Sequence, residues 1–307
     1  MLEYGLTVLN QIITMFLLMM VGFALAKLRL INKDGTAQIS SILMSIIMPS
    51  TVLSAFERTY ERALAVQLLQ ALVLTVIVYA VPVLAARIFY KTQPDKALCL
   101  VFSNNGFMAI PLIQALLGST GVFLGSAHIV GANIMTWTYG VSKYRAGEQE
   151  SQKKLWRTLL LNPGTLALLG GLVLFLTPGA LPSPLLNAVN HLAAMNTPLA
   201  MLLLGTYLSD IKLRESLRDK SLLLLSALKL IVLPLILIGI FWLLPFSPLV
   251  RCAMLIGSAA PTGIVVSMLA QYCKRDNRWN TTVVTFTTLC SIITMPVILV
   301  LMNAVLG

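Results

Sequence analysis

Residues 103–111 read SNNGFMAIP in the middle of an apolar segment, and residues 257–263 read GSAAPTG in the middle of another. Neither stretch favours a continuous helix, because Gly and Asn have low helix propensities and Pro removes a backbone hydrogen bond. Both segments are otherwise long and apolar. The two stretches therefore predict a pair of interrupted helices, and the surrounding chain indicates the fold to which these helices belong.

The rest of the chain is unusually poor in charge. Of its 307 residues, 58% are hydrophobic and only 11% are charged, with a mean hydropathy of +0.87. A soluble domain carries about 25% charged residues, so this chain cannot cover its own surface in water. Lipid is expected to solvate most of it, which predicts an all-α membrane protein.

Ten apolar segments are long enough, at about 20 residues, to cross a bilayer. The expected spans cover residues 7–27, 36–56, 63–88, 96–116, 119–142, 157–177, 185–208, 221–244, 248–271 and 280–305. The two interrupted helices are therefore spans 4 and 9. Residues 117–119 and 245–248 are expected to form tight turns.

Basic residues are concentrated on alternate loops between these spans. Eighteen of the 22 Lys and Arg residues fall on one set of loops, whereas the other set holds only Arg58, Arg62 and Arg251. The positive-inside rule makes the basic side cytoplasmic, which places both termini outside a bacterial cytoplasmic membrane. The net charge of +11 then indicates contact with an anionic bilayer surface, not with nucleic acid.

Prolines inside the spans repeat along the chain. Pro49, Pro82 and Pro111 in spans 2, 3 and 4 are followed by Pro198, Pro234 and Pro261 in spans 7, 8 and 9, at spacings of 149, 152 and 150 residues. Because each half has an odd number of spans, the second half enters from the opposite side, as in inverted-topology transporter repeats. We expect a first five-helix repeat over residues 1–143, a cytoplasmic linker over 144–156 and an inverted second repeat over 157–307.

The paired interruptions are the candidate substrate site. Unwound backbone in a membrane is tolerated where protein or a water-filled cavity surrounds it. The N-termini of half-helices offer free N–H groups and a positive dipole end to a carboxylate, and Asn amides donate to the same oxygens. Close packing of small residues is the alternative. The candidate binding residues are Asn104, Asn105, Gly106, Pro111, Ala260, Pro261 and Thr262.

Lys229 is the only charged residue deep inside a span, about 12 Å from the cytoplasmic end of span 8 at 1.5 Å per residue. Charged residues at this depth usually face the protein interior. We expect its ammonium group to be a fixed positive charge near the helix crossing, where it attracts the anion or replaces a coupling cation. The alternatives are that it snorkels to the cytoplasm or binds backbone carbonyls.

Other polar residues give weaker signals. Candidate cavity-lining residues are Ser103, Met108, Pro49, Ser50, His128 and Asn133. His128 is also a candidate proton or substrate site, although a lone His more often bonds a neighbouring helix. The Thr- and Ser-rich span 10 is expected to bond backbone or neighbouring helices, with sodium coordination as the alternative. No metal site, cofactor or enzymatic residue set is expected, because the spans contain no paired carboxylates, no HExxH and no Ser/His/Asp set.

The chain resembles the auxin efflux carrier family of plant and prokaryotic transporters, which includes bacterial malate-type permeases. Residues 103–112, SNNGFMAIPL, are similar to the family's span-4 pattern of Asn followed by Met-Gly-Ile-Pro-Leu. Residues 260–265, APTGIV, are similar to its span-9 pattern LPQGIV. Asn162-Pro163 matches the opening of span 6, and Lys229 matches the basic residue before the span-8 proline.

The resemblance implies a fold shared with bile-acid/sodium symporters. Spans 1, 2, 6 and 7 would form a scaffold, often dimeric. Spans 3–5 and 8–10 would form a mobile transport domain in which broken helices 4 and 9 cross and which moves like an elevator. Asn104 falls where plant carriers bind the auxin carboxylate. Thr262 replaces their Gln, and their long central loop is absent, so a small bacterial metabolite is expected in place of auxin.

The function that the resemblance implies is secondary transport of small organic anions, either malate-like or auxin-like carboxylates. A sodium-coupled symporter of the bile-acid type is the nearest alternative. A membrane receptor without transport activity and an intramembrane enzyme are further alternatives. The exact substrate, the coupling ion and the direction of transport stay open at this point.

Overall fold

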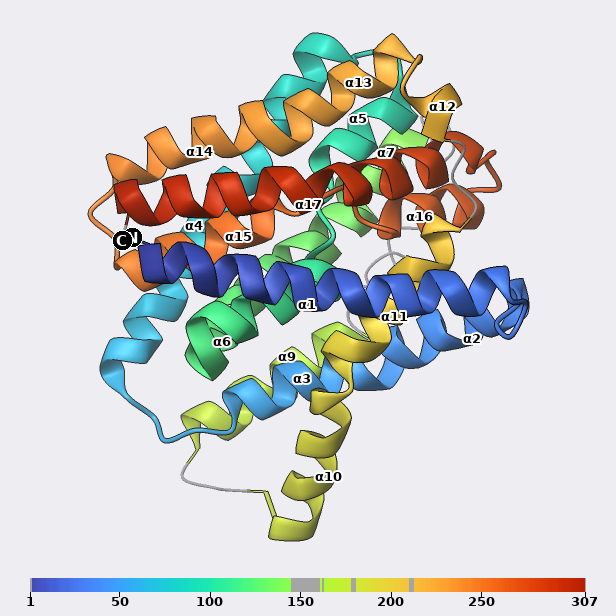
Figure 1. Cartoon of the computed structure of the whole chain (residues 1–307). Helices are drawn as coiled ribbons and strands as arrows, with labels where there is room; N and C mark the ends of the chain where they lie inside the picture. The colour runs from blue at the N-terminus through green and yellow to red at the C-terminus, as the bar shows by residue number, and fades with distance from the viewer. Residues whose placement is uncertain (1, 145–160, 162, 178–180, 210–212, 307) are drawn as a thin grey trace.

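The computed structural model describes residues 2–144, 161, 163–177, 181–209 and 213–306. Over these ranges the regular secondary structure is helical, and the β-type pairing is confined to one isolated bridge. The prediction of an all-helical membrane protein is confirmed. Figure 1 shows long helices that run side by side, with the start of α1 and the end of α17 at the same end of the molecule.

The first half of the chain covers the first five of the expected spans. Its helices are α1 (Leu2–Lys27), α2 (Lys33–Ile42), η1 (Leu43–Ile47), α3 (Met48–Phe56), α4 (Arg62–Phe89), α5 (Pro94–Val101), η2 (Asn105–Ala109), α6 (Ile110–Met135), η3 (Thr136–Gly140) and α7 (Val141–Tyr144). The elements labelled η are π-helical turns. The backbone of α6 changes direction at Gly118, which has φ 65° and ψ −164° and lies in the turn expected over residues 117–119.

The described part of the second half supplies a further set of helices. They are α9 (Pro163–Leu176), α10 (Ser183–Ala194), α11 (Asn196–Leu208), α12 (Leu213–Ser216), α13 (Lys220–Ala227), η4 (Leu228–Val232), α14 (Leu233–Trp242), α15 (Pro248–Ala259), α16 (Val265–Tyr272) and α17 (Arg278–Leu306). The linker expected over residues 144–156 lies almost entirely outside the described residues, as does the start of span 6.

Six helical stretches of the described chain are long and apolar enough to cross a membrane, judged by length and composition. They are Leu9–Lys27, Lys33–Phe56, Arg62–Phe89, Asn105–Tyr144, Lys220–Trp242 and Arg278–Leu306. Two shorter apolar helices are α9 and α15. Because Asn105–Tyr144 turns at Gly118, its 40 residues contain the end of expected span 4 and the whole of span 5.

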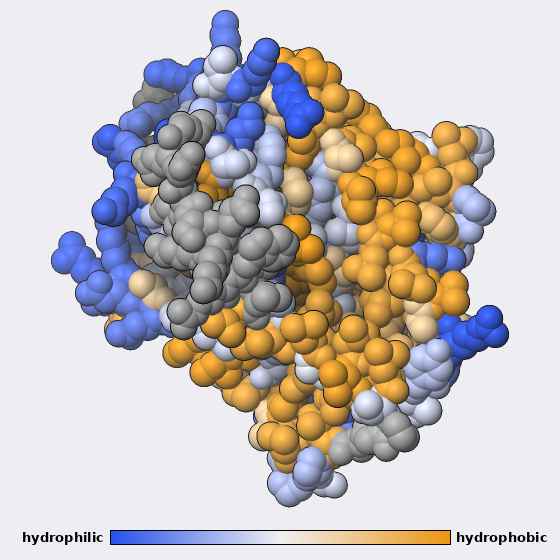
Figure 2. All heavy atoms as spheres, turned by 180° about the vertical axis from the view of Figure 1, so that it is seen from behind, coloured by the Kyte–Doolittle hydropathy of each residue, from blue (hydrophilic) through white to orange (hydrophobic). Residues whose placement is uncertain are grey.

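The surface matches this membrane assignment. Figure 2 shows hydrophilic side chains gathered at one end of the molecule and hydrophobic ones over most of the remaining face. Large apolar side chains such as Leu17, Val76 and Ile293 are 61%, 69% and 74% exposed. Such side chains would be unfavourable in water but are solvated by lipid tails.

Three π-helical turns have a common cause in the sequence. η1, η2 and η4 each end two residues before a proline, namely Pro49, Pro111 and Pro234. A proline ring clashes with the carbonyl group four residues earlier and has no N–H to bond it. The wider π turn relieves this clash without breaking the helix. Two of these turns contain residues of the candidate site, because Asn105 and Gly106 lie in η2 and Lys229 lies in η4.

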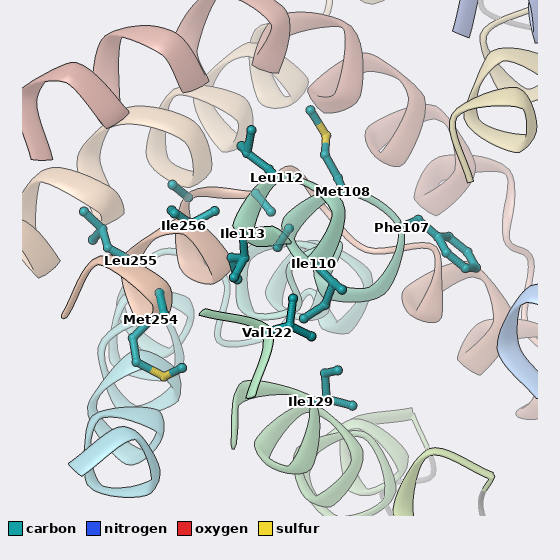
Figure 3. Packing of buried hydrophobic residues seen from close by; sticks show 14 of the residues in the cluster. Phe107, Met108, Ile110, Leu112, Ile113, Val122, Ile129, Met254, Leu255 and Ile256 are labelled. Carbon is teal, nitrogen blue, oxygen red and sulfur yellow. The ribbon is translucent and has the colours of Figure 1, made fainter. Parts of the chain in front are cut away.

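Packing is tightest where helices from the two halves meet. α1 crosses α11 so closely that a Cβ atom at Gly22 would lie 2.0 Å from the Leu202 carbonyl oxygen, and one at Gly205 would lie 2.0 Å from the Met19 carbonyl oxygen. Buried side chains of η2 and α6 belong to the same apolar core as Met254, Leu255 and Ile256 of α15 (Figure 3). Small residues thus permit backbone contact, and large ones fill the space between helices.

Candidate helix-crossing site

The two interrupted helices meet at their breaks. α5 ends at Val101 and η2 begins at Asn105, while α15 ends at Ala259 and α16 begins at Val265. The intervening residues 102–104 and 260–264 lie side by side and form the isolated antiparallel bridge. The Asn104 N–H donates to the Pro261 carbonyl at 2.7 Å. Each break therefore satisfies backbone groups that the other leaves unpaired.

The first break lies earlier in the chain than the sequence suggests. At the interruption expected over residues 103–111, only the backbone of residues 102–104 is non-helical, and residues 105–111 form a π turn followed by α-helix. The second break covers residues 260–264, close to the expected position. The reason is that the π turn η2 accommodates Pro111, and the pairing with residues 261–263 sets where the helix ends.

Gly263 permits the close approach of the two breaks. Its N–H donates to the Phe102 carbonyl at 3.0 Å. A Cβ atom on this residue would lie only 2.7 Å from the Ser103 carbonyl oxygen, which is backbone and cannot rotate away. A residue with a side chain would therefore force the two breaks apart.

The backbone N–H and the hydroxyl group of Thr262 both form hydrogen bonds within the protein. Its N–H donates to the Thr287 hydroxyl at 3.1 Å, and its own hydroxyl donates to the Cys99 carbonyl at 2.9 Å. The side chain is fully buried. Thr262 thus anchors the second break to α5 and α17. Thr287 belongs to the hydroxyl-rich span 10, but nothing in the sequence indicates that it holds Thr262.

Lys229 lies at the same crossing, on η4. Its Nζ donates to the Ser103 hydroxyl at 2.7 Å and to the Leu100 carbonyl at 3.1 Å, and the residue is 2% exposed. Leu100 belongs to the last turn of α5, where unpaired carbonyls form the negative end of the helix dipole. The lysine therefore binds a backbone carbonyl, as the alternative interpretation expects, and also places its positive charge beside the break.

A cavity of about 110 Å³ opens beside the crossing. No charged side chain lines it. It is lined by Met44, Met48, Ser103, Asn104, Asn105, Gly106, Phe107, Ile129, Ala132, Asn133, Thr136, Gly263, Ile264 and Val265.

Both half-helix N-termini face this cavity. In the described chain, the N–H groups of Gly106 and Phe107 at the start of η2 have no hydrogen-bond acceptor, and neither have those of Ile264 and Val265 at the start of α16. The first turn of a helix leaves such donors free, at the positive end of the dipole. The arrangement can therefore hold a small anion.

Two buried amides complete the polar wall. Asn104 is 4% exposed, and its Nδ2 has no hydrogen-bond partner. The Nδ2 of Asn105 donates to the Tyr79 hydroxyl at 3.4 Å, while its Oδ1 has no partner. Buried polar atoms without partners are rare in proteins, and they commonly mark a missing ligand or water molecule. Here they line a cavity that two helix N-termini also face.

Comparison with known proteins identifies the class of molecule that carries this site. The sequence model of the membrane transport protein family matches residues 7–299. The chain belongs to this family. The resemblance to auxin efflux carriers is thereby confirmed, and the chain is a transporter, not an enzyme. It is also similar to an uncharacterized transporter of Methanothermobacter thermautotrophicus, with 21% identity over 298 residues that cover 94% of this chain and 96% of that protein.

The transport protein brings together only part of the residue set expected from the sequence. Ser103, Asn104, Asn105, Gly106 and Asn133 line the crossing cavity. Lys229, Ala260, Pro261 and Thr262 lie at the crossing but behind its wall, and Pro111 lines a different cavity. Four further expected residues also lie outside the cavity lining, namely Pro49, Ser50, Met108 and His128.

Three of these outlying residues have another contact. His128 stacks edge-on against Tyr79, with ring centroids 5.2 Å apart, and fills the space beside Gly257, where a Cβ atom would lie 2.2 Å from its Nδ1. Met108 accepts a hydrogen bond from the Ser291 hydroxyl at 3.6 Å, and Ser50 donates to the Ile46 carbonyl at 2.8 Å. These residues pack around the transport protein's crossing without facing its cavity.

Proposed function

We propose that this membrane transport protein is a secondary transporter of small organic anions, and that it binds the substrate carboxylate between the N-termini of η2 and α16. The observation that carries the proposal is the set of four free N–H groups around one cavity, with the unpaired Asn104 amide beside them. Backbone donors of this kind bind anions at many helix N-termini. In transporters they do so at paired broken helices.

The charges near the crossing favour an anion. Ser103 lines the cavity, and the Lys229 ammonium lies behind it and donates a hydrogen bond to its hydroxyl group. A positive charge in a low-dielectric interior attracts an anion more strongly than it would in water, although desolvation opposes part of the gain. No acidic side chain lines the cavity to repel the substrate.

The cavity favours one class of carboxylate over the other. Its volume of about 110 Å³ is small beside the roughly 300–1,000 Å³ typical of drug-sized ligands. Met44, Met48, Phe107 and Ile129 form an apolar wall, and no cationic side chain lines the cavity to pair with a second carboxylate. A monocarboxylate with a small apolar body therefore fits better than a malate-like dicarboxylate. A neighbouring cavity of about 180 Å³ shares Ile129 and Asn133 and offers more apolar space.

The sodium-coupled alternative is less favoured by the same contacts. The Lys229 ammonium occupies the Leu100 carbonyl and the Ser103 hydroxyl, which are oxygen ligands of the type that a bound sodium ion would need.

The finer architecture is part of the proposal. Ten spans in two inverted repeats account for the matching breaks, the proline spacing and the position of the start of α1 and the end of α17 at the same end of the molecule in Figure 1. The scaffold would contain α1–α3 and α9–α11, and the remaining helices would move against it in an elevator-like step. The close contact at Gly22 and Gly205 would keep the scaffold rigid. We further propose a homodimer through the scaffold in a bacterial cytoplasmic membrane, with both termini outside.

Ligand binding by the purified protein tests the function. Thermal-shift measurements would compare phenylacetate and indole-3-acetate with malate, and with phenethylamine as a cation of similar apolar body, at equal ionic strength. We expect stabilisation by the monocarboxylates, less by malate and none by the amine. Counterflow in proteoliposomes would then show transport of the bound compound. Preference for the amine would overturn the electrostatic argument, and preference for malate would overturn the monocarboxylate assignment only.

A further inference from the structure

The cavity of about 180 Å³ beside the crossing cavity lies between α3, α6 and α9, which pack against one another (Figure 1). It is here called the side cavity. Its wall is almost entirely hydrocarbon, and no charged side chain lines it. The lining residues used below are Val52, Ile129, Val130, Asn133, Ile134 and Leu169.

Two helices line the side cavity along their length. α6 contributes Ser126, Val130 and Asn133, at spacings of four and three residues, and α9 contributes Thr165 and Leu168, three residues apart. Residues at these spacings lie on one face of a helix. From Ser126 to Asn133 the face extends for about two turns, or about 10 Å. The side cavity is therefore a long apolar space between two helices, which is the shape that an unbranched hydrocarbon chain fills.

The side cavity opens to the bilayer. Its inner wall contains Val52 and Ser126, which are 1% and 0% exposed, and its outer wall contains Ile134 and Leu169, which are 45% and 46% exposed. Exposed apolar side chains on membrane-spanning helices face the acyl chains of lipid. The side cavity thus runs from the interior of the protein to its lipid-facing surface.

The inner end of the side cavity meets the crossing cavity. The two cavities share Ile129 and Asn133 in their linings. Within the described chain, the side-chain amide of Asn133 has no hydrogen-bond partner. A polar group without a partner at this depth in a membrane costs free energy, which a ligand oxygen atom recovers. Asn133 therefore lies where the polar head of a ligand would meet its apolar tail.

We propose that the side cavity holds the acyl tail of the substrate while the crossing holds its carboxylate, so that the transported anions include unbranched fatty acids of medium length, such as octanoate. This inference rests on the proposed binding of a carboxylate at the crossing. The Asn133 amide, at the junction, donates to the carboxylate. A tail longer than the side cavity leaves between Ile134 and Leu169 and stays in lipid, so the length of the tail has no sharp upper limit.

The free acid is a better occupant than a membrane phospholipid. A phospholipid offers the same tail to the side cavity, but it has no carboxylate for the free N–H groups of η2 and α16. A fatty acid occupies both cavities at once. Each methylene group that the side cavity or the adjoining lipid removes from water should raise the affinity about fourfold.

Alkanoates of increasing length test the tail site. Binding of propanoate, hexanoate, octanoate and decanoate to the purified protein in phosphatidylcholine nanodiscs would be measured by isothermal titration, with empty nanodiscs as the blank. We expect the affinity to rise about fourfold per methylene from propanoate to octanoate, and not to fall at decanoate. A loss of affinity beyond hexanoate would indicate a closed pocket and would overturn the proposal.

Val130→Phe fills the side cavity, and propanoate binding reports the crossing in the same variant. The affinity for octanoate should fall at least tenfold, about 1.4 kcal/mol, whereas that for propanoate should stay unchanged, which also shows that the variant is folded. Thr165→Phe fills the same space from α9 and should give the same result. Val76→Phe is the matched control, because Val76 is 69% exposed on α4 and lines neither cavity.

The outcomes separate the tail site from the proposed function. Octanoate affinity that is equal in the wild type and in both filled variants would overturn the tail site, whether or not propanoate binds. Propanoate binding with no gain for octanoate would leave the anion site in place and also overturn the tail site. If octanol binds the wild type as tightly as octanoate and loses affinity in Val130→Phe, the tail site stands and the proposed selection of anions fails.

Discussion

The Lys229 ammonium and the Ser103 hydroxyl lie 2.7 Å apart, with the lysine buried and the serine on the wall of the crossing cavity. The Ser103 hydroxyl in turn donates to the Ser258 carbonyl at 3.2 Å, in the last turn of α15. The charge of η4 is thus connected to both interrupted helices by one hydroxyl group. This relationship gives the lysine two roles, since it pairs backbone oxygen atoms and sets the electrostatic potential of the cavity.

Lys229→Met should weaken binding of a carboxylate at least tenfold, about 1.4 kcal/mol, because it removes the charge and keeps most of the side-chain volume. It should also lower the thermal stability, since the Leu100 carbonyl loses its donor. Isothermal titration with phenylacetate and a melting curve measure the two effects. Lys220→Met, at the exposed start of α13, is the matched control and should change neither. Unchanged affinity in Lys229→Met would show that the lysine is only structural.

Asn104→Ala should reduce carboxylate affinity about tenfold, because the unpaired Nδ2 is a side-chain donor on the cavity that the free N–H groups also face. Asn104→Asp should reduce it further at neutral pH, since it replaces a donor with a like charge at the same size. The exposed Asn187→Ala on α10 serves as control. Equal affinities for Asn104→Ala and Asn104→Asp would contradict an anionic ligand at this position.

Gly263→Ala should destabilise the protein by roughly 1–3 kcal/mol, because its Cβ would overlap the Ser103 carbonyl and push the breaks apart. Gly239→Ala is the matched control. A Cβ there meets nothing within 4 Å, and Gly-to-Ala in a helix interior adds roughly 0.5–1 kcal/mol of stability. Melting temperatures in detergent compare the two. A Gly263→Ala variant as stable as Gly239→Ala would rule out the tight contact.

Thr262→Val tests whether this residue touches the substrate or positions the break. It leaves the Cys99 carbonyl without a donor, a loss of roughly 1–3 kcal/mol in a buried site. Thr262→Ser keeps the hydroxyl and should restore both stability and affinity. The proposed positioning role requires affinity and stability to change together. A loss of carboxylate affinity in Thr262→Val at full stability would make Thr262 a direct ligand.

Thiol labelling tests the orientation in the membrane. In a cysteine-free variant, Thr59→Cys between α3 and α4 should react with a membrane-impermeant reagent on intact cells. Arg29→Cys, in the exposed loop after α1, should react only after permeabilisation. The reverse pattern would place both termini in the cytoplasm.

The sequence determined the helices, because apolar segments of this length leave a chain in lipid few other structures. It also located the two breaks to within a few residues and singled out Asn104 and Lys229. The positions of Pro49, Pro111 and Pro234 indicated irregular helix geometry. They did not indicate that a π turn would absorb each proline, since that depends on how neighbouring helices pack.

Only the tertiary structure decided which groups face the cavity. Lys229 finds its acceptors 126 and 129 residues earlier in the chain, and Thr262 finds its acceptor 163 residues earlier. Local propensity contains no information about contacts at such separations. The Thr262 hydroxyl donates its hydrogen bond to the Cys99 carbonyl, whereas the Asn104 Nδ2 has no partner and lies beside the free N–H groups. The physical reason is that buried polar groups pair with one another wherever the fold brings them together. Only the donors and acceptors that packing leaves unpaired can bind a ligand.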